Sequence, residues 1–319
     1  MNDYLPLLLA VAPVFLTIGT GWGIRRVGWL SAEADASLLR VVVNLLFPCL
    51  ILDKILGNGA LENAGNILLA PVAGFATVAA GYALCFLAAP LFGVRDARQR
   101  RTFAFTAGIY NYGYIALPLI QKLFDRDDQR TSAVLFIHNI GVEAALWTFG
   151  IMLISGAAPR RVWTHVFNAP VVTILLAIAL HFAGGRAWLP GFALEAVHGL
   201  GVAAIPLGLI LTGATFADQM RELKFTTSAA DSLGACVLRL GVLPLLMLAL
   251  ARWLPCPVEL RRVILVQAAM PCAVIPVILA KHYGGDPGTA LRLILATSVV
   301  GLLTIPLWLH LGLRWIAVG

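Results

Sequence analysis

Charge is scarce in this chain of 319 residues. Only 12% of the residues are Asp, Glu, Lys or Arg and 60% are hydrophobic, whereas a typical soluble domain is about 25% charged. So few charges cannot cover a water-soluble globule, which excludes a soluble enzyme. The charged residues cluster between apolar stretches of about 20 residues, the length at which a helix crosses a bilayer. The chain is therefore predicted to lie mostly within a membrane.

Residue patterns that carry enzyme chemistry are also missing. The five cysteines include no Cys-x-x-Cys pair, and no His-Glu-x-x-His or Gly-x-Ser-x-Gly pattern occurs. The acidic run Asp125-Arg126-Asp127-Asp128 suggests a membrane prenyltransferase, but such enzymes need a second acidic cluster to hold Mg²⁺ and diphosphate. The matching part of the second half offers only Asp286. We therefore expect no enzyme, no catalytic residue, no cofactor and no metal site.

The apolar stretches predict an all-α integral membrane protein with ten transmembrane helices. The expected spans are 4–24, 40–57, 67–92, 102–124, 131–156, 168–184, 192–217, 229–253, 258–282 and 288–316. Charged residues set their ends. The second, sixth and seventh runs are the weakest, because they are short or carry polar residues.

The two halves of the chain repeat each other at an almost constant offset. The recurring positions are Ala12-Pro13-Val14 with Ala169-Pro170-Val171, Trp29 with Trp188, Pro48 with Pro206, Pro118 with Pro276, Lys122 with Lys281, and Asp127 with Asp286. Each unit holds five spans, and an odd number makes the second unit enter from the opposite side of the membrane. We expect two inverted repeats, 1–156 and 168–319, joined by a short cytoplasmic connection at 157–167.

Basic residues predict the orientation in the membrane. On the ten-span scheme, the side opposite the N-terminus carries the basic clusters at 95–101 and 160–161 and has the larger number of Lys and Arg residues. Because cytoplasmic loops are the more basic ones, both termini are expected outside a plasma membrane, the inner membrane if the source is bacterial. The net charge of +7 is spread over helix ends, so the expected partner is the lipid bilayer and not nucleic acid. A homodimer stays open.

Two spans at equivalent places in the halves carry signs of interruption. The fourth holds Asn111 before Pro118, and the ninth holds Gln267 before Pro276. Proline frees backbone groups, which are tolerated within a membrane only where protein or water satisfies them. We therefore expect broken, crossing helices four and nine at the binding site of a secondary transporter. The alternative is that the prolines are simple kinks and the amides bind neighbouring helices.

The candidate residues follow from that pattern. The residues expected to bind substrate are Asn111, Gln267, Tyr110, Tyr114 and Asn44, and those expected to form the breaks are Pro118, Pro271, Pro276 and Gly113.

Two charges lie deep in apolar runs: Glu143 in the fifth span and Arg239 in the eighth. A charge at the bilayer centre costs about 2.5–3.5 kcal/mol on insertion scales, so both are expected to face the interior of the bundle. Two interpretations stay open. The charges pair with each other, or Glu143 carries a coupling proton while Arg239 attracts an anion. His138 and Asn139, one turn before Glu143, would extend its polar face.

At these residues the chain resembles the auxin efflux carrier family, which includes plant auxin exporters and bacterial malate or malonate permease-like proteins. The nearest match is residues 266–283 (VQAAMPCAVIPVILAKHY), which resemble the ninth helix of the plant carriers nearly position for position. Arg239 five residues before Pro244 and Asn168-Ala169-Pro170 add to the likeness. Glu143 and Cys272 depart from it, since the plant carriers tend to have an uncharged amide and another polar residue there.

The resemblance implies a scaffold part and a transport part, with elevator-like alternating access and a substrate held where helices four and nine cross. We therefore expect a secondary active transporter, a permease or efflux carrier, of a small organic anion such as a carboxylate. The coupling ion, H⁺ or Na⁺, stays open. The alternatives are a passive anion channel or a transporter-like receptor on the same scaffold and, least favoured, the prenyltransferase-type enzyme.

Overall fold

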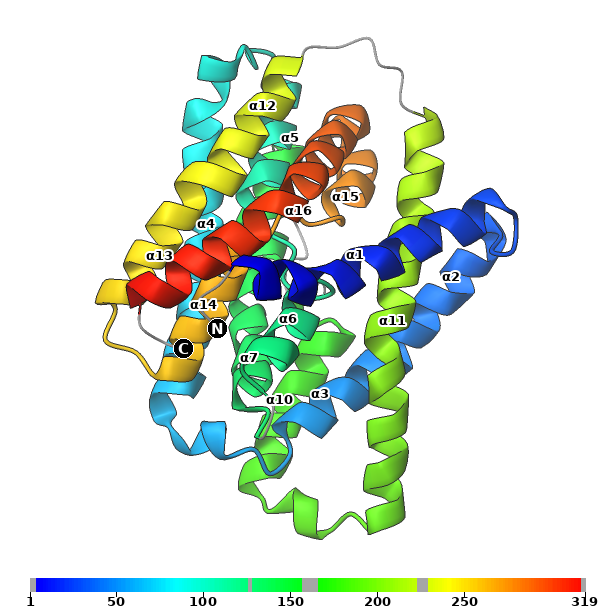
Figure 1. The fold of residues 1–319 in the computed structure, drawn as a ribbon, viewed down its shortest axis with the longest axis vertical. Helices are drawn as coiled ribbons and strands as arrows, with labels where there is room; N and C mark the ends of the chain where they lie inside the picture. Colours follow the sequence, from blue (N-terminus) through cyan, green and yellow to red (C-terminus); the bar gives the residue numbers. More distant parts are fainter. Residues whose placement is uncertain (1–3, 126–127, 157–165, 223–228, 317–319) are drawn as a thin grey trace.

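The computed structural model describes residues 4–125, 128–156, 166–222 and 229–316, and the elements in this part of the chain are helices (Figure 1). The first half contains α1 (Tyr4–Arg26), α2 (Ala32–Val41), α3 (Phe47–Ile55), α4 (Ala64–Ala88), α5 (Ala97–Gly108), α6 (Ala116–Leu123), α7 (Arg130–Ala145) and α8 (Ile151–Ser155). The second half contains α10 (Ala169–Phe182), α11 (Gly191–Glu222), α12 (Ala229–Val237), α13 (Leu243–Trp253), α14 (Val258–Ala269), α15 (Pro276–His282) and α16 (Pro287–Ile316). Most of the expected connection at 157–167 lies outside the described residues.

Three pairs of helices continue into each other through a single wider turn. The π-helical segments Val42–Leu46, Leu146–Gly150 and Leu238–Val242 join α2 to α3, α7 to α8 and α12 to α13. Such insertions are frequent at functional sites, and the third contains Arg239.

Seven continuous helices in the described part are long and apolar enough to cross a membrane. They are Tyr4–Arg26, Ala32–Ile55, Ala64–Phe92, Arg130–Ser155, Gly191–Met220, Ala229–Trp253 and Pro287–Ile316. The helix α10 is apolar but shorter, and the apolar stretches at 102–124 and 258–282 are each divided into two helices. The structure corrects one boundary, because the second span begins at Ala32 and not near residue 40. Ser31 caps that helix, and its charged first turns extend it before the apolar run.

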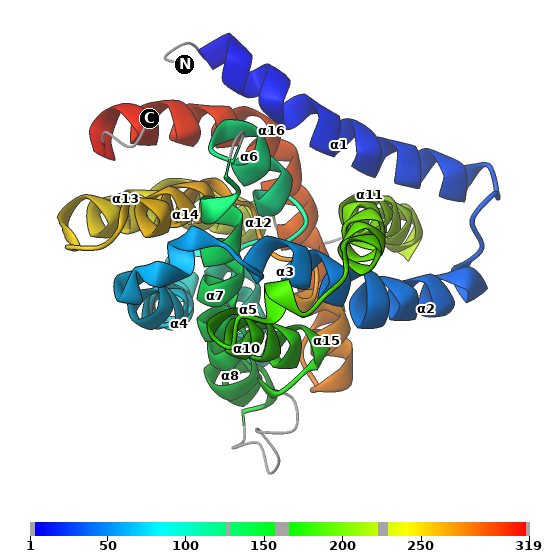
Figure 2. The same cartoon turned by 90° about the horizontal axis from the view of Figure 1, so that it is seen from below.

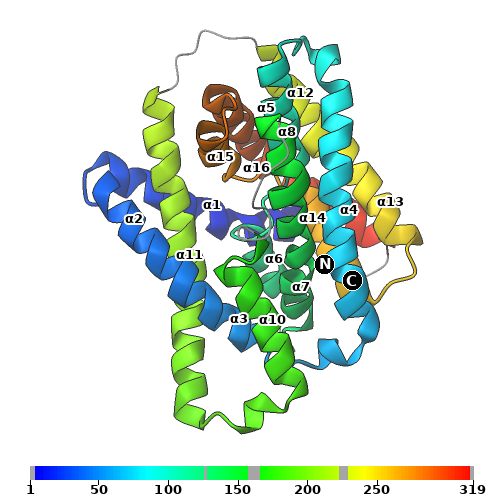
Figure 3. The same ribbon diagram turned by 180° about the vertical axis from the view of Figure 1, so that it is seen from behind.

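The helices form two groups. The α11 group consists of α1, α2, α3, α10 and α11, and the α4 group consists of α4 to α8 and α12 to α16; Figures 1 and 3 show α2 and α11 on one side and α4 and α13 on the other. Small residues allow close packing within each group. A Cβ at Gly213 of α11 would overlap the Ile18 carbonyl of α1, and one at Gly141 of α7 would overlap the Pro71 carbonyl of α4. Such close approach is how helices associate in lipid, where apolar burial gives little driving force.

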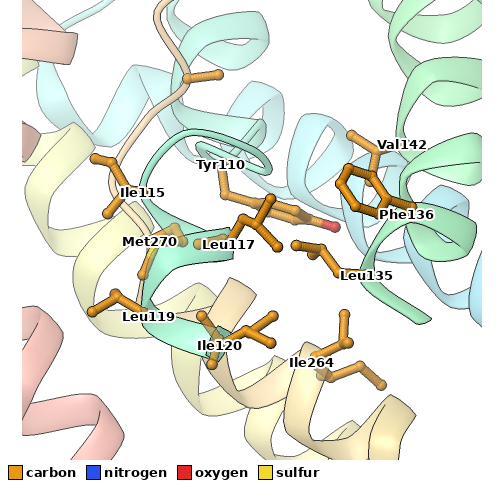
Figure 4. Packing of buried hydrophobic residues seen from close by; sticks show 14 of the residues in the cluster. Tyr110, Ile115, Leu117, Leu119, Ile120, Leu135, Phe136, Val142, Ile264 and Met270 are labelled. Carbon is orange, nitrogen blue, oxygen red and sulfur yellow. The ribbon is translucent and has the colours of Figure 1, made fainter. Parts of the chain in front are cut away.

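The two groups meet around α7, which lies near the centre of the molecule (Figure 2). Figure 4 shows the apolar packing at this point: Leu117 and Ile120 of α6 lie near Leu135 of α7 and Ile264 of α14. All four side chains are buried. One side of the central region is therefore a filled apolar core.

Candidate functional site

Two interrupted helices meet in the interior of the α4 group. The first break, residues 109–115, separates α5 from α6, and the second, residues 270–275, separates α14 from α15. The two segments pair as short antiparallel strands: the Asn111 amide donates to the Pro271 carbonyl at 2.8 Å, and the Ala273 amide donates to the Ile109 carbonyl at 3.1 Å. We call these two segments the crossing.

The prolines lie where the helices resume. Gly113 and Pro271 are within the two breaks, Pro276 is the first residue of α15, and Pro118 is in the first turn of α6. The first turn of a helix accepts proline because its N–H groups have no partner within the helix. The N-terminal ends of α6 and α15, which carry partial positive charge, therefore adjoin the crossing.

Two amide side chains converge on one carbonyl of the crossing. Asn139 Nδ2 of α7 donates to the Tyr112 carbonyl at 3.0 Å, and Gln267 Nε2 of α14 donates to the same oxygen at 3.3 Å. Gln267 is fully buried, and Asn139 is 8% exposed. Their oxygen atoms, Oδ1 of Asn139 and Oε1 of Gln267, have no hydrogen-bond partner among the described residues. Because an unpaired buried polar group costs about 1–3 kcal/mol, these two atoms need an explanation.

Asn111 keeps a free donor at the crossing. Its side chain is 6% exposed, and its Oδ1 accepts from the Ile115 amide at 3.4 Å. No hydrogen bond from its Nδ2 is formed within the described part of the chain. Asn111 can therefore donate to a ligand.

The other three candidate residues face different surroundings. Tyr110 is fully buried, with its hydroxyl 2.9 Å from Thr77 Oγ1 of α4. The Tyr114 ring lies edge-on to Phe47 of α3 at 5.4 Å between centroids. Asn44 is exposed and donates to the Arg40 carbonyl at 3.0 Å. Of the three, only the Tyr114 side chain joins the crossing to the α11 group.

Glu143 is held by three donors from three parts of the fold. Its Oε1 accepts from the Tyr112 hydroxyl of the crossing at 2.7 Å. Its Oε2 accepts from Trp147 Nε1 on the next turn and from Asn168 Nδ2 at the start of α10, both at 2.8 Å. Charge-assisted hydrogen bonds of this kind stabilise a carboxylate without a cationic partner.

The positive charge of Arg239 is stabilised by other groups than those that hold Glu143. It is 1% exposed, its guanidinium carbon lies 5.3 Å from the Tyr110 ring centroid, and its Nη2 is 3.4 Å from the Ala268 carbonyl near the end of α14. A cation at the C-terminal end of a helix offsets the partial negative charge there. The interpretation that Glu143 and Arg239 pair is wrong, because no ion pair joins them in the described structure.

Comparison with known proteins shows the family of this chain. The family model described as membrane transport protein matches residues 6–162 and 158–309. The chain belongs to the membrane transport protein family. This is the auxin efflux carrier family that residues 266–283 resemble. An uncharacterized transporter of Methanothermobacter thermautotrophicus is 25% identical over 93% of this chain and 96% of its own length. A second, from Methanocaldococcus jannaschii, is 22% identical over 92% and 95%.

As a membrane transport protein, the chain belongs to a family of transporters. The acidic run after α6 has local structural partners: Asp125 accepts from the Thr131 and Ser132 amides at the start of α7, and Asp128 pairs with Arg130. Asp127 lies outside the described residues. The described residues hold no group of three or more His, Cys, Asp or Glu side chains suited to a metal.

Sequence reasoning did not identify the three residues that donate hydrogen bonds to Glu143 in this transporter. Trp147 could have been found, because it lies four residues after Glu143 and therefore on the same helix face. Tyr112 and Asn168 gave no such signal, since they reach Glu143 from other elements.

Proposed function

We propose that this transporter is a secondary carrier that binds a small organic anion, a carboxylate, at the crossing. The observation that carries the proposal is the pairing of two interrupted helices by backbone hydrogen bonds, with free polar groups beside them. Broken helices at a repeat interface are typical of secondary transporters and of their substrate sites.

The proposal includes the ten-span architecture of two inverted repeats, 1–156 and 168–319. Each half contains one divided stretch, α5 with α6 and α14 with α15, and each divided stretch precedes a long continuous helix, Arg130–Ser155 or Pro287–Ile316. The shared order supports a duplicated unit.

The anion would be bound by donors and positive potential. Asn111 Nδ2 donates to the carboxylate, the N-terminal ends of α6 and α15 attract it, and Arg239 adds positive charge from behind Tyr110. No atom lies within 4 Å of the position that a Cβ would take at Gly113, so the segment is open at that residue. Gln267 fixes the Tyr112 carbonyl.

Movement between the two helix groups would give alternating access. The α11 group acts as the scaffold, and the α4 group carries the crossing across the membrane in an elevator-like motion. Contacts that must change are those of Tyr114 with Phe47 and of Glu143 with Asn168. Rigid-body movement of one bundle against the other is the common mode in such folds.

The orientation of the protein in the membrane is proposed from the position of its basic residues. The start of α5, the start of α12 and the far end of α11 lie at one end of the molecule (Figure 1), and this end carries the basic cluster at 95–101. We assign it to the cytoplasm, which puts both termini outside the plasma membrane.

The test is uptake by purified protein in proteoliposomes. Asn111→Ala and Gln267→Ala are expected to abolish saturable carboxylate uptake and counterflow while the variants still fold. Gln99→Ala, at the start of α5 and away from the crossing, is the matched control and should transport normally. Normal uptake in both crossing variants would remove the proposed site, and flux without saturation or counterflow would indicate a channel.

A further inference from the structure

We propose that the crossing also binds a monovalent cation, Na⁺, through Gln267 Oε1 and Asn139 Oδ1. Backbone carbonyls of the crossing and water would complete its shell. The site deepens the proposed function, because its role in coupling rests on that function, whereas cation binding itself does not.

Two of the atoms left unpaired beside the crossing, Gln267 Oε1 and Asn139 Oδ1, are acceptors. Both amides direct their NH₂ groups to the Tyr112 carbonyl, and the reverse orientation would set two oxygen acceptors against each other. The carbonyl therefore fixes which way each amide points. Each amide oxygen shares a carbon with its nitrogen, so Gln267 Oε1 and Asn139 Oδ1 both lie within a few ångströms of Tyr112. Both side chains are more than nine-tenths buried.

Two buried oxygen acceptors that receive no hydrogen bond favour a cation as their ligand. Neutral amide and carbonyl oxygens are hard ligands, and no cluster of His, Cys, Asp or Glu suited to a transition metal occurs in the part of the chain described. Ca²⁺ and Mg²⁺ are usually held by carboxylates, whereas broken helices in transporters hold Na⁺ through carbonyl oxygens. A sodium ion therefore fits better than a divalent or transition metal ion.

Charge balance allows the ion. Glu143 Oε1 accepts a hydrogen bond from the Tyr112 hydroxyl at 2.7 Å. Arg239 lies against the Tyr110 ring and the Ala268 carbonyl. These two buried charges have opposite sign, so Na⁺ bound together with a carboxylate on Asn111 Nδ2 leaves the region neutral. Each ligand would then favour binding of the other.

The experiment is thermal unfolding of the purified protein without substrate, in NaCl and in KCl or choline chloride at equal ionic strength. We expect Na⁺ alone to raise Tm in a saturable way, since a ligand that binds only the folded state stabilises it. Gln267→Ala and Asn139→Ala should weaken the apparent Na⁺ affinity about tenfold or more. Gln99→Ala is the control. The unfolding transition of each variant in KCl shows whether that variant folds, which guards against variants that fold poorly.

The outcomes separate the two proposals. Equal Tm in all salts for the wild-type protein, or an Na⁺ response unchanged in both Ala variants, overturns the cation site. Asn111→Ala should lose uptake yet keep the Na⁺ response. If uptake depends on Asn111 and no Na⁺ response exists, the carrier stands without the cation; if the response exists without carboxylate uptake, the proposed function fails alone.

Discussion

Asp286 caps the N-terminal end of α16. Its Oδ1 accepts from the Gly288 amide at 3.0 Å and the Thr289 amide at 3.3 Å, and its Oδ2 accepts from the Thr289 hydroxyl at 2.6 Å. Partial burial raises the pKa of the Asp286 carboxyl, but these hydrogen bonds and the Arg292 charge outweigh it and hold the pKa below its usual value. The carboxylate therefore stabilises the folded state.

Replacing Asp286 should make stability less dependent on pH. A folded-state pKa below the unfolded value gives stabilisation that is present above about pH 4 and is lost as pH falls through the folded pKa. We expect Asp286→Ala to cost about 1 kcal/mol at pH 7. Asp286→Asn, which keeps a capping oxygen, should cost less. Thermal unfolding in detergent at neutral and acid pH checks this, and a gap between wild type and Asn variant that persists in acid would contradict it.

The buried charges show what single residues reveal. A charged residue within an apolar run is recognised directly from the sequence. Both such residues, Glu143 and Arg239, lie buried beside the crossing. Their partners could not be inferred, because Tyr112 and Asn168 come from other elements and Arg239 uses a ring and a carbonyl. Composition locates such a charge, and only tertiary packing decides how it is neutralised.

At the scale of elements, the hydrogen bond between Glu143 and Asn168 ties α7 to the start of α10. Asn168 has two tasks: its Nδ2 donates to Glu143, and its Oδ1 accepts from the Val171 amide as the cap of α10. Aspartate can perform the second task but not the first. This difference allows the contact between the helices to be tested without loss of the cap.

Asn168→Asp should therefore destabilise the protein by facing Glu143 with a second carboxylate. Glu143→Gln should also destabilise the protein, by about 1–3 kcal/mol, because the NH₂ group of the new amide cannot accept the hydrogen bonds that Oε2 accepts. In Glu143→Gln combined with Asn168→Asp the donor and acceptor are exchanged, so the double variant should lose less stability than the sum of the two. Thermal unfolding of the four proteins gives the coupling, and strictly additive losses would show that the two side chains do not interact.

Helix ends were predicted with uneven success. Apolar runs bounded by charges gave α1 and the span Ala229–Trp253 within a few residues. The breaks were predicted at Gly113, Pro118, Pro271 and Pro276, and the chain leaves the helices at Ile109 and Met270. Proline starts a helix as readily as it ends one, and the pairing of the two extended segments depends on contacts between distant parts of the chain.

At the scale of the whole molecule, Tyr114 rests against the α11 group. A Cβ on Gly208 of α11 would overlap the Tyr114 ring, which also packs against Phe47 of α3. A side chain at residue 208 would therefore force the Tyr114 ring or the neighbouring helices to shift.

Gly208→Ala should destabilise this arrangement by about 1–3 kcal/mol, the usual cost of overpacking. Combining it with Tyr114→Ala removes the overlap and should recover part of the loss. Gly199→Ala on the same helix meets nothing within 4 Å and is the matched control. Thermal unfolding checks all three, and equal behaviour of the Gly208 and Gly199 variants would contradict the packing.

The backbone pairing of Asn111 with Pro271 and of Ala273 with Ile109 uses no side-chain atom. Substitution of the side chains around the crossing therefore leaves this backbone pairing intact. Under the proposed function, relatives that share only about a quarter of their residues can differ in substrate while they keep the same paired backbone segments.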